Sequence, residues 1–302
     1  MARDLETRVF TPVVPPEQKK QEQDFLRFVE YMNQMAAEIG MTDSHFCDAA
    51  GMHNLVTARD LLRLLAYADK YPVLRKVWTT DHYTVNVEGD NPRQMACISK
   101  SIHPDLDAHY RALGKKGGSL MSSRTGLYVY NLASILEIPG SEDRLAVVVM
   151  YAEEGNQKPN NRFKATKQVA DIAIAKYKDP NADVSAMPVC CENAIAAVLP
   201  ADGTDYKVVF ELNADEKGRP MSISKVLTAV CVLDQVKDLS EKFTYDAFDT
   251  NIGGFYISDY LPGDTVTYED AFYALMLESS NVTAQALARS VGIKIKDLEK
   301  SC

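Results

Sequence analysis

Ser222-Ile223-Ser224-Lys225 opens the apolar run 226–233 and decides the fold and the chemistry expected for this chain. Positions i and i+3 of a helix lie on one face, so a helix at this point brings Ser222 and Lys225 together. A serine hydroxyl is a poor nucleophile near neutral pH, but a buried lysine amine with a lowered pKa can take its proton. Pro220 suits the residues that lead into a helix, and the N–H groups of a first helical turn favour negative charge near Ser222. The pattern therefore predicts a site for acyl transfer.

Two further elements bear on the same chemistry. Ser279-Ser280-Asn281 lies 57 residues after Ser222 and precedes a helical segment. Lys116-Gly117-Gly118-Ser119 lies far upstream, before two β-rich runs over 127–136 and 144–151. A serine with a lysine, then S-x-N, then K-T-G is a combination typical of penicillin-binding proteins and class A β-lactamases. In this chain the third element comes first.

The resemblance extends over most of the chain. Residues 189–292 resemble the front of a D-alanyl-D-alanine carboxypeptidase, with a strand pair, the serine–lysine helix, the turn 261–267 and the S-x-N element. Residues 24–178 resemble the rest of the same domain, including Tyr130-Asn131-Leu132-Ala133-Ser134, which is similar to a strand of that family. The chain therefore resembles a D-alanyl-D-alanine carboxypeptidase, of the penicillin-binding protein and serine β-lactamase-like family, in circularly permuted order.

The permuted order is physically reasonable because chain ends lie at the surface of compact domains and often close together. Residues 178–188, with turn signals at Asp179-Pro180-Asn181, are expected to join the last helix of the family to its first strand. Permutation also predicts that residues 21–25 lie near 295–302. A natural permutation, an engineered one and a piece cut across two tandem copies all give this order.

The distribution of helix and strand signals along the sequence favours a fold that contains both helices and strands. Thr57 and Thr267 each precede an S/T-x-x-D/E-like arrangement that predicts a helix start. Other expected helices cover 25–39, 161–177 and the residues from 222, and expected strands cover 127–136, 144–151, 193–199 and 206–212. We expect an α+β, β-lactamase/transpeptidase-like fold, in which an antiparallel sheet flanked by helices lies next to a mostly helical subdomain, with the cleft between them.

The expected organisation is one domain behind a flexible lead-in that contains Pro12, Pro15 and Pro16. The domain covers residues 21–302 and the lead-in covers 1–20. The helical subdomain is assembled from about 21–105 and 226–302, and the α/β subdomain covers about 106–225. Both ends of the chain thus contribute to the helical subdomain.

The resemblance implies a role for each residue of the site. Ser222 attacks a carbonyl and becomes the ester of an acyl-enzyme, with Lys225 as the base. Ser279 relays protons between Lys225 and the leaving amine, and Asn281 holds the substrate amide. The resemblance implies no metal and no other cofactor. Its substrate is a peptidoglycan stem peptide or a β-lactam.

The upstream element contributes the remaining roles and also departs from the family pattern. Lys116 supplies positive charge that favours a substrate carboxylate, and the backbone N–H groups of Ser222 and Ser119 form the oxyanion hole beside Gly118. Gly117 stands where the family has threonine or serine, so a hydroxyl that helps hold the terminal carboxylate of the substrate is missing. Ser119 and the neighbouring Ser122 and Ser123 are candidates to replace it.

A rival placement of the third element is Arg124-Thr125-Gly126, which restores the threonine and replaces lysine with arginine. We prefer Lys116, because Gly117-Gly118-Ser119-Leu120 continues like the family strand and leaves 124–126 as a hairpin turn. The choice affects which cation faces the substrate.

Three functions are compatible with these residues. The first is a serine D-Ala-D-Ala carboxypeptidase acting on peptidoglycan stem peptides. The second is a β-lactamase, which is disfavoured because no E-x-x-L-N segment appears to activate water for deacylation. The third is a catalytically weak relative that binds muropeptides or β-lactams.

Composition limits the other possibilities. With 302 residues, 46% of them hydrophobic, the chain can bury a sizeable core, and its net charge of −9 argues against a nucleic-acid partner. No apolar run approaches the roughly 18 residues that span a bilayer, and no signal peptide is recognisable at the start. The family nevertheless implies an extracytoplasmic, cell-envelope location. The six cysteines and five histidines lie at no zinc-ligand spacing, so we expect structural or incidental roles for them.

Overall fold

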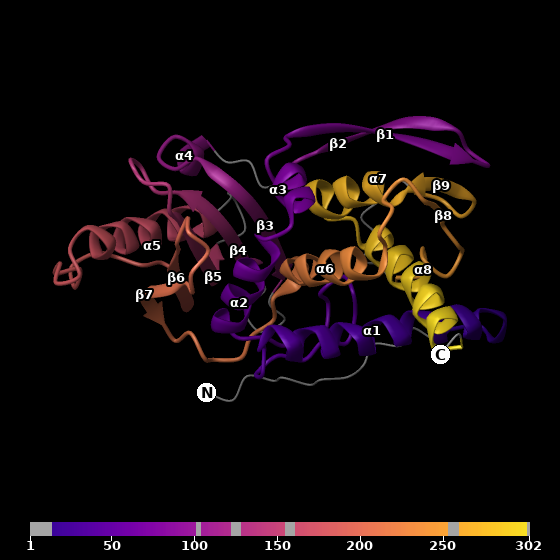
Figure 1. Ribbon diagram of the computed structural model, residues 1–302, viewed down its shortest axis with the longest axis horizontal. Coiled ribbons are helices and arrows are strands. Elements are labelled where there is room, and N and C mark those ends of the chain that lie inside the picture. The colour runs from indigo at the N-terminus through magenta and orange to yellow at the C-terminus, as the bar shows by residue number, and fades with distance from the viewer. Residues whose placement is uncertain (1–13, 101–103, 122–127, 155–160, 253–259, 301–302) are drawn as a thin grey trace.

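The larger sheet joins both halves of the chain. The structure is a computed structural model that describes residues 14–100, 104–121, 128–154, 161–252 and 260–300. Five antiparallel strands lie in the order β3-β4-β5-β6-β7 (Figure 1). They are β3 (Ala112–Met121), β4 (Tyr128–Glu137), β5 (Arg144–Glu154), β6 (Asn193–Leu199) and β7 (Lys207–Leu212). β5 pairs with β6, with Arg144 opposite Leu199 and Met150 opposite Asn193, so the strand pair of the downstream half extends the strands of the upstream half.

Helices cover both faces of this sheet. α5 (Asn161–Lys178) packs on one face and α2 (Ala58–Ala68) on the other (Figure 1). Successive side chains of a strand point to opposite faces, and β4 follows this rule: Ala133 and Ile135 join one buried cluster, Leu132 and Leu136 the other. Every residue of β6 is buried, as expected for a central strand with both faces covered. The antiparallel sheet flanked by helices is the architecture expected from the sequence.

The predicted helix caps are confirmed. Thr57 precedes α2, and its Oγ1 accepts a hydrogen bond from the backbone N–H of Asp60 at 3.1 Å. Thr267 precedes α7 (Tyr268–Tyr273) and accepts in the same way from Asp270 at 3.0 Å. Each cap satisfies one N–H group of a first helical turn that has no partner within its helix.

The last residues of the expected lead-in, 14–20, are described, and most of them are helical. A 3₁₀ turn, η1 (Pro16–Gln18), runs directly into α1 (Lys19–Ile39), and Val14 is buried against the core. A proline at the first helical position is favourable, which explains why the two prolines that suggested a loop instead precede a helix. Only residues 1–13 of the expected lead-in lie outside the described part of the chain.

The beginning of α1 and the end of α8 (Asn281–Glu299) lie side by side (Figure 1). Lys296 Nζ lies 3.5 Å from Asp24 Oδ1, and Arg27 Nε lies 3.4 Å from Glu299 Oε2. The proximity expected between 21–25 and 295–302 is therefore observed up to residue 300. This arrangement is compatible with circular permutation, which remains a prediction.

A second, four-stranded sheet lies in the predicted helical subdomain and was not foreseen. Its order is β2-β1-β9-β8, formed by β1 (His82–Gly89), β2 (Arg93–Ile98), β8 (Lys242–Thr244) and β9 (Asp264–Thr267). Val85 and Val87 are the buried, alternating positions of β1, a signal short enough to be lost among the surrounding helical patterns. The subdomain boundaries at about 105 and 225 remain a prediction.

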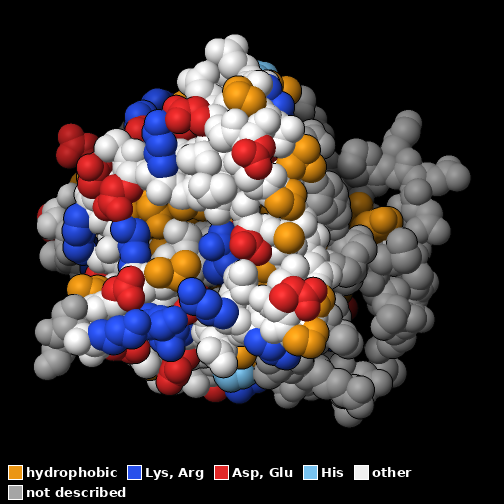
Figure 2. All heavy atoms as spheres, turned by 90° about the vertical axis from the view of Figure 1, so that its right-hand side faces the viewer, with side chains coloured by type: hydrophobic (Ala, Val, Ile, Leu, Met, Phe, Trp, Pro, Cys, Tyr) orange, Lys and Arg blue, Asp and Glu red, His pale blue; other side chains and the backbone are white. Residues whose placement is uncertain are grey.

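The remaining helices complete the part of the chain that the structure describes. They are α3 (Pro72–Trp78), α4 (Pro104–Asp107), the 3₁₀ turn η2 (Met221–Ser224), α6 (Lys225–Gln235) and the π-helical turn η3 (Ala274–Glu278). No helix among the described residues is long and apolar enough to cross a membrane. Figure 2 shows Lys and Arg side chains interspersed with Asp and Glu on one face of the molecule.

Candidate active site

Ser222 and Lys225 are brought together by a 3₁₀ turn. η2 ends at Ser224 and α6 begins at Lys225, so the first turn is 3₁₀ rather than α-helical. A 3₁₀ helix has three residues per turn, which places positions i and i+3 directly above one another. Lys225 Nζ accordingly lies 2.9 Å from Ser222 Oγ, within hydrogen-bond distance. The pairing predicted from the spacing is confirmed.

Lys225 is fully buried among groups that accept hydrogen bonds. Its Nζ also donates to the backbone carbonyl of Ala50 at 2.8 Å and to Asn281 Oδ1 at 2.7 Å. Burial lowers the pKa of Lys225 to about 7; Asp48 opposes this shift and Lys100 adds to it. A substantial fraction of the amine is therefore neutral near pH 7 and able to accept the proton of Ser222.

Ser279 is not the cap of the following helix. The neighbouring Ser280 caps α8, because its Oγ accepts a hydrogen bond from Thr283 N at 3.0 Å. Ser279 has a left-handed backbone, with φ of 62°, and its Oγ accepts from Lys116 Nζ at 2.8 Å. A left-handed conformation costs a non-glycine residue about 1–3 kcal/mol, and such strain occurs most often at functional sites. The hydroxyl of Ser279 thus pairs with Lys116.

Lys116 is buried as deeply as Lys225. Only 2% of its surface is exposed, and its Nζ also donates to the carbonyl of Gly117 at 3.1 Å. Burial lowers the pKa of Lys116 well below the ordinary value, and the charges of Lys225, Arg162 and Lys100 lower it further. This environment shifts Lys116 toward the neutral amine, and its expected role toward a substrate carboxylate remains a prediction.

β3 forms the opposite wall of the site. A Cβ built on Gly118 would lie 3.1 Å from the backbone N of Ser222 and 2.7 Å from the carbonyl oxygen of Pro220, so the strand packs directly against η2. β3 is an edge strand, and an edge strand has N–H and C=O groups without strand partners. Ser119 lies at this edge with its side chain exposed. The oxyanion hole predicted from Ser222 and Ser119 N–H groups remains a prediction at this contact.

Arg162, in the first turn of α5, is a site residue that the sequence analysis missed. A Cβ on Gly117 would lie 2.8 Å from Arg162 Nη1, so the guanidinium occupies the space next to the glycine. Nη1 donates to Ser119 Oγ at 3.2 Å and to the carbonyl of Gly118 at 3.4 Å, and the group lies 5.1 Å from the ring centroid of Tyr130. At Gly117, where the sequence departs from the family pattern, the Arg162 guanidinium from α5 therefore fills the space of the missing side chain.

The structure does not bear on the other candidates from the sequence. Ser122, Ser123 and the rival element Arg124-Thr125-Gly126 lie outside the described residues. No group of three His, Cys, Asp or Glu side chains in the described ranges could hold a metal ion. The cysteines at 47, 97, 190, 191 and 231 are free thiols.

Comparison with known proteins points in the same direction. Residues 188–299 match the sequence profile described as "Beta-lactamase enzyme family", a range that contains both Ser222–Lys225 and Ser279–Asn281. The D-alanyl-D-alanine endopeptidase of Pseudomonas aeruginosa is 42% identical over 60 residues, 19% of each chain. That of Escherichia coli is 38% identical over 55 residues, 18% of each chain. The profile match shows that a part of the chain that includes Ser222–Lys225 and Ser279–Asn281 resembles β-lactamase enzymes.

The extent of these matches is limited. The chain spans about a fifth of the length of the curated relatives it matches. The family profile leaves β3, with Lys116, outside the matched range. No solved structure matches the chain significantly.

Proposed function

We propose that the chain is a serine-type acyl-transfer enzyme that acts on D-Ala-D-Ala peptides of peptidoglycan, with Ser222 as the nucleophile. The observation that carries the proposal is the 2.9 Å contact of Ser222 Oγ with Lys225 Nζ, a fully buried amine whose pKa is about 7. A neutral amine in contact with a partly exposed hydroxyl is the arrangement that activates a serine without a histidine.

The proposed reaction runs through an acyl-enzyme. Lys225 accepts the proton of Ser222 as Oγ attacks the carbonyl carbon, and N–H groups of η2 and β3 stabilise the oxyanion. The ammonium form of Lys225 then supplies the proton that the leaving amine needs, and the C–N bond breaks. Ser279, hydrogen-bonded to Lys116, is a second hydroxyl for this proton transfer. Water then attacks the ester and releases Ser222.

Substrate choice is proposed to depend on Arg162. It lies beside Gly117 and Ser119 of β3, next to the position where the family has a hydroxyl and this chain has none. A guanidinium can bind a carboxylate through two parallel N–H···O bonds, whereas Lys116 is held in an environment that favours a neutral amine. This favours peptides with a free terminal carboxylate, and hence carboxypeptidase activity. The curated relatives are named as endopeptidases, so cleavage at an internal D-alanine is the alternative within the same chemistry.

Arg162→Ala tests this assignment. It should lower the acylation rate by penicillin G about 10- to 100-fold, as expected for a lost hydrogen bond to a charged group worth about 1.5–3 kcal/mol. The methyl ester of penicillin G has no carboxylate and should react equally with both proteins. Lys167→Ala removes another cation of α5, which pairs with Asp171, and should leave both rates unchanged. Equal losses with the acid and the ester would contradict a carboxylate-binding role.

A β-lactamase is the second candidate, because the matched profile is described as a β-lactamase enzyme family. A catalytically weak relative that binds muropeptides or β-lactams is the third. The three differ in the lifetime of the acyl-enzyme and in turnover. Slow deacylation with peptide turnover fits the first candidate, rapid drug hydrolysis the second, and neither activity the third.

Circular permutation of this family is part of the proposal. The family profile begins at residue 188, at the end of the predicted junction 178–188. β6 pairs with β5 across that junction, and the start of α1 contacts the end of α8. A location in the cell envelope follows from the proposed substrate.

Incubation with penicillin G, followed by intact mass and peptide mapping, is the first experiment. One stable adduct on Ser222 would support the peptidase proposal. An unmodified protein with consumed drug would favour the β-lactamase. An unmodified protein with intact drug would contradict acyl transfer and favour the third candidate.

A further inference from the structure

The loop over residues 47–54 is organised around a single carboxylate. Asp48 is 6% exposed, and its two oxygens accept hydrogen bonds from four backbone N–H groups that follow it. These donors are Ala50 (2.8 Å), Gly51 (2.5 Å), Met52 (3.0 Å) and His53 (2.8 Å). A carboxylate that accepts several N–H bonds fixes the path of the backbone around it. The Asp48 carboxylate therefore fixes the backbone conformation of this loop.

This loop is attached to the catalytic turn at several points. The Ala50 carbonyl accepts from Lys225 Nζ at 2.8 Å, and its own N–H is one of the Asp48 donors. Thr228 Oγ1, one turn further along α6, donates to the Ala49 carbonyl at 2.7 Å. Asn54 Nδ2 donates to Ser224 Oγ at 2.9 Å. The loop thus contacts the turn on which both Ser222 and Lys225 lie.

A close backbone approach completes the attachment. Gly51 has φ of 97°, and a Cβ at this position would lie 1.8 Å from the Met221 carbonyl oxygen. Met221 itself has a positive φ of 55° and directly precedes Ser222. Only glycine fits here, because any side chain would collide with the backbone of the catalytic turn. Displacing the loop would therefore also displace Ser222.

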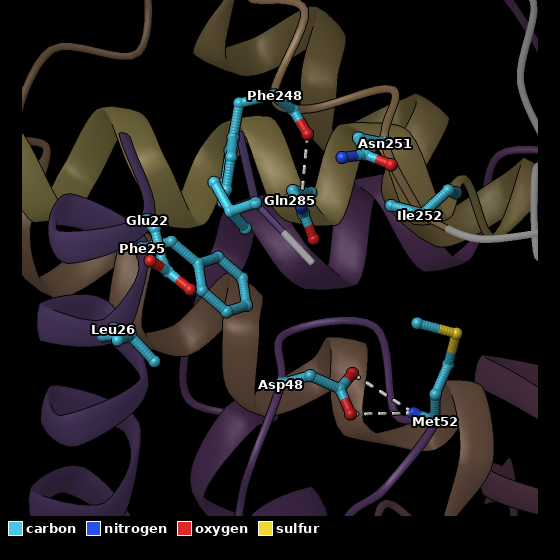
Figure 3. A pocket seen from close by; sticks show the side chains of 10 residues that line it. Glu22, Phe25, Leu26, Asp48, Met52, Phe248, Asn251, Ile252 and Gln285 are labelled. Carbon is cyan, nitrogen blue, oxygen red and sulfur yellow. Dashed lines mark hydrogen bonds between the residues drawn. The ribbon is translucent and has the colours of Figure 1, made fainter. Parts of the chain in front are cut away.

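The charge of Asp48 acts on the Lys225 amine through surroundings that screen it weakly. Asp48 and Met52 line one side of a small pocket whose other lining residues include Glu22, Phe25, Phe248 and Ile252 (Figure 3). Apolar walls and burial weaken the solvent screening of a charge. Ser222 and Asn281 contact the Lys225 amine as neutral groups, Lys116 faces it from β3, and Lys100 lies further out. Asp48 is the carboxylate whose charge raises the pKa of Lys225, against the lowering effect of Lys100.

We propose that Asp48 is a positioning residue for Lys225, which holds the Ala50 carbonyl against the amine and supplies the negative charge that opposes the charge of Lys100. The proposal rests on the proposed role of Lys225 as the base. Without the carboxylate, the Ala50 carbonyl is held less firmly against the amine, and the charge of Lys100 on Lys225 is no longer opposed. The amine is then neutral over a wider range of pH but is less well placed to take the proton of Ser222.

The titration of Lys225 tests the proposal directly and without substrate. In protein labelled with ¹³C at lysine Cε, the Lys225 resonance is the one that is missing from Lys225→Met. We expect a midpoint near pH 7 in the wild-type protein and about one pH unit lower in Asp48→Asn, since a nearby unit charge is removed from a poorly screened site. Asp48→Ser provides a second neutral residue that still accepts a hydrogen bond, and it should shift the midpoint in the same direction.

Asp60→Asn is the matched control. Asp60 is also fully buried and accepts hydrogen bonds from Asp43 N and Ser44 Oγ, but it contacts neither the loop over 47–54 nor Lys225. It should leave the Lys225 midpoint unchanged. A folded Asp48→Asn or Asp48→Ser protein with the wild-type midpoint would overturn the proposal. A wild-type midpoint near pH 10 would instead contradict Lys225 as the base, so the two failures are distinguishable.

Discussion

Ser222→Ala is expected to abolish the covalent adduct with penicillin G and to lower peptide turnover on the order of 10⁶-fold, the loss typical of a serine hydrolase without its nucleophile. The reason is structural: Ser222 Oγ is the hydroxyl in contact with the buried amine of Lys225. No acyl ester can form on alanine. The measurement is intact mass after incubation with a large excess of drug.

Ser224→Ala is the matched control for this experiment. Ser224 lies in the same 3₁₀ turn, is fully buried and accepts a hydrogen bond from Asn54 Nδ2 at 2.9 Å. Its loss should reduce stability by about 1 kcal/mol and leave the adduct in place. An adduct that persists in Ser222→Ala would move the nucleophile elsewhere, with Ser279 as the next hydroxyl to test.

The sequence predicted those parts of the site that depend on short spacings. Ser222 and Lys225 are three residues apart, so any helical turn pairs them, and the structure does so with a 3₁₀ turn. Thr57 and Thr267 cap helices because the cap and its N–H donor are also three residues apart. Local geometry of this kind needs no knowledge of the tertiary fold.

Contacts between distant segments were not predictable in the same way. Arg162 reaches the site from α5, and only the missing side chain at Gly117 hinted that another group fills that space. The carbonyl of Ala50 is a backbone acceptor, which any residue type provides, so the sequence carries no signal for it. Ser279 and Ser280 are adjacent serines, and the left-handed backbone of Ser279 decides which of them caps α8.

Lys225→Met is expected to lower the acylation rate about 10²- to 10⁴-fold, the contribution typical of a positioned general base. Methionine fills a similar volume and cannot accept the proton of Ser222. Methionine also lacks the N–H donors of Lys225, so the Ala50 carbonyl and Asn281 Oδ1 each lose one hydrogen bond. This should lower the free energy of unfolding by about 1–3 kcal/mol per buried group. Adduct formation measured at pH 7 gives the catalytic part of this prediction.

The free energy of unfolding should depend on pH differently in the wild type and in Lys225→Met, because burial lowers the pKa of Lys225 to about 7 in the folded state. In the unfolded chain a lysine has a pKa of about 10.4. Between these values the unfolded state binds one more proton, so the free energy of unfolding of the wild type rises with pH by about 1.4 kcal/mol per unit relative to Lys225→Met. Below pH 7 and above pH 10.4 the difference is constant.

Urea unfolding of both proteins at intervals from pH 6 to 10 measures this difference, which should change by about 4 kcal/mol over that range. Lys116 is also buried with a lowered pKa, and the charge of Lys225 contributes to that shift, so the same pair of curves is also measured in a Lys116→Met background, where Lys116 contributes nothing. Lys242→Met removes a half-exposed lysine paired with Glu88, and it should show no such change between pH 7 and 10. Parallel curves for the wild type and Lys225→Met would mean that Lys225 titrates normally, and the buried amine could not then be the base that activates Ser222.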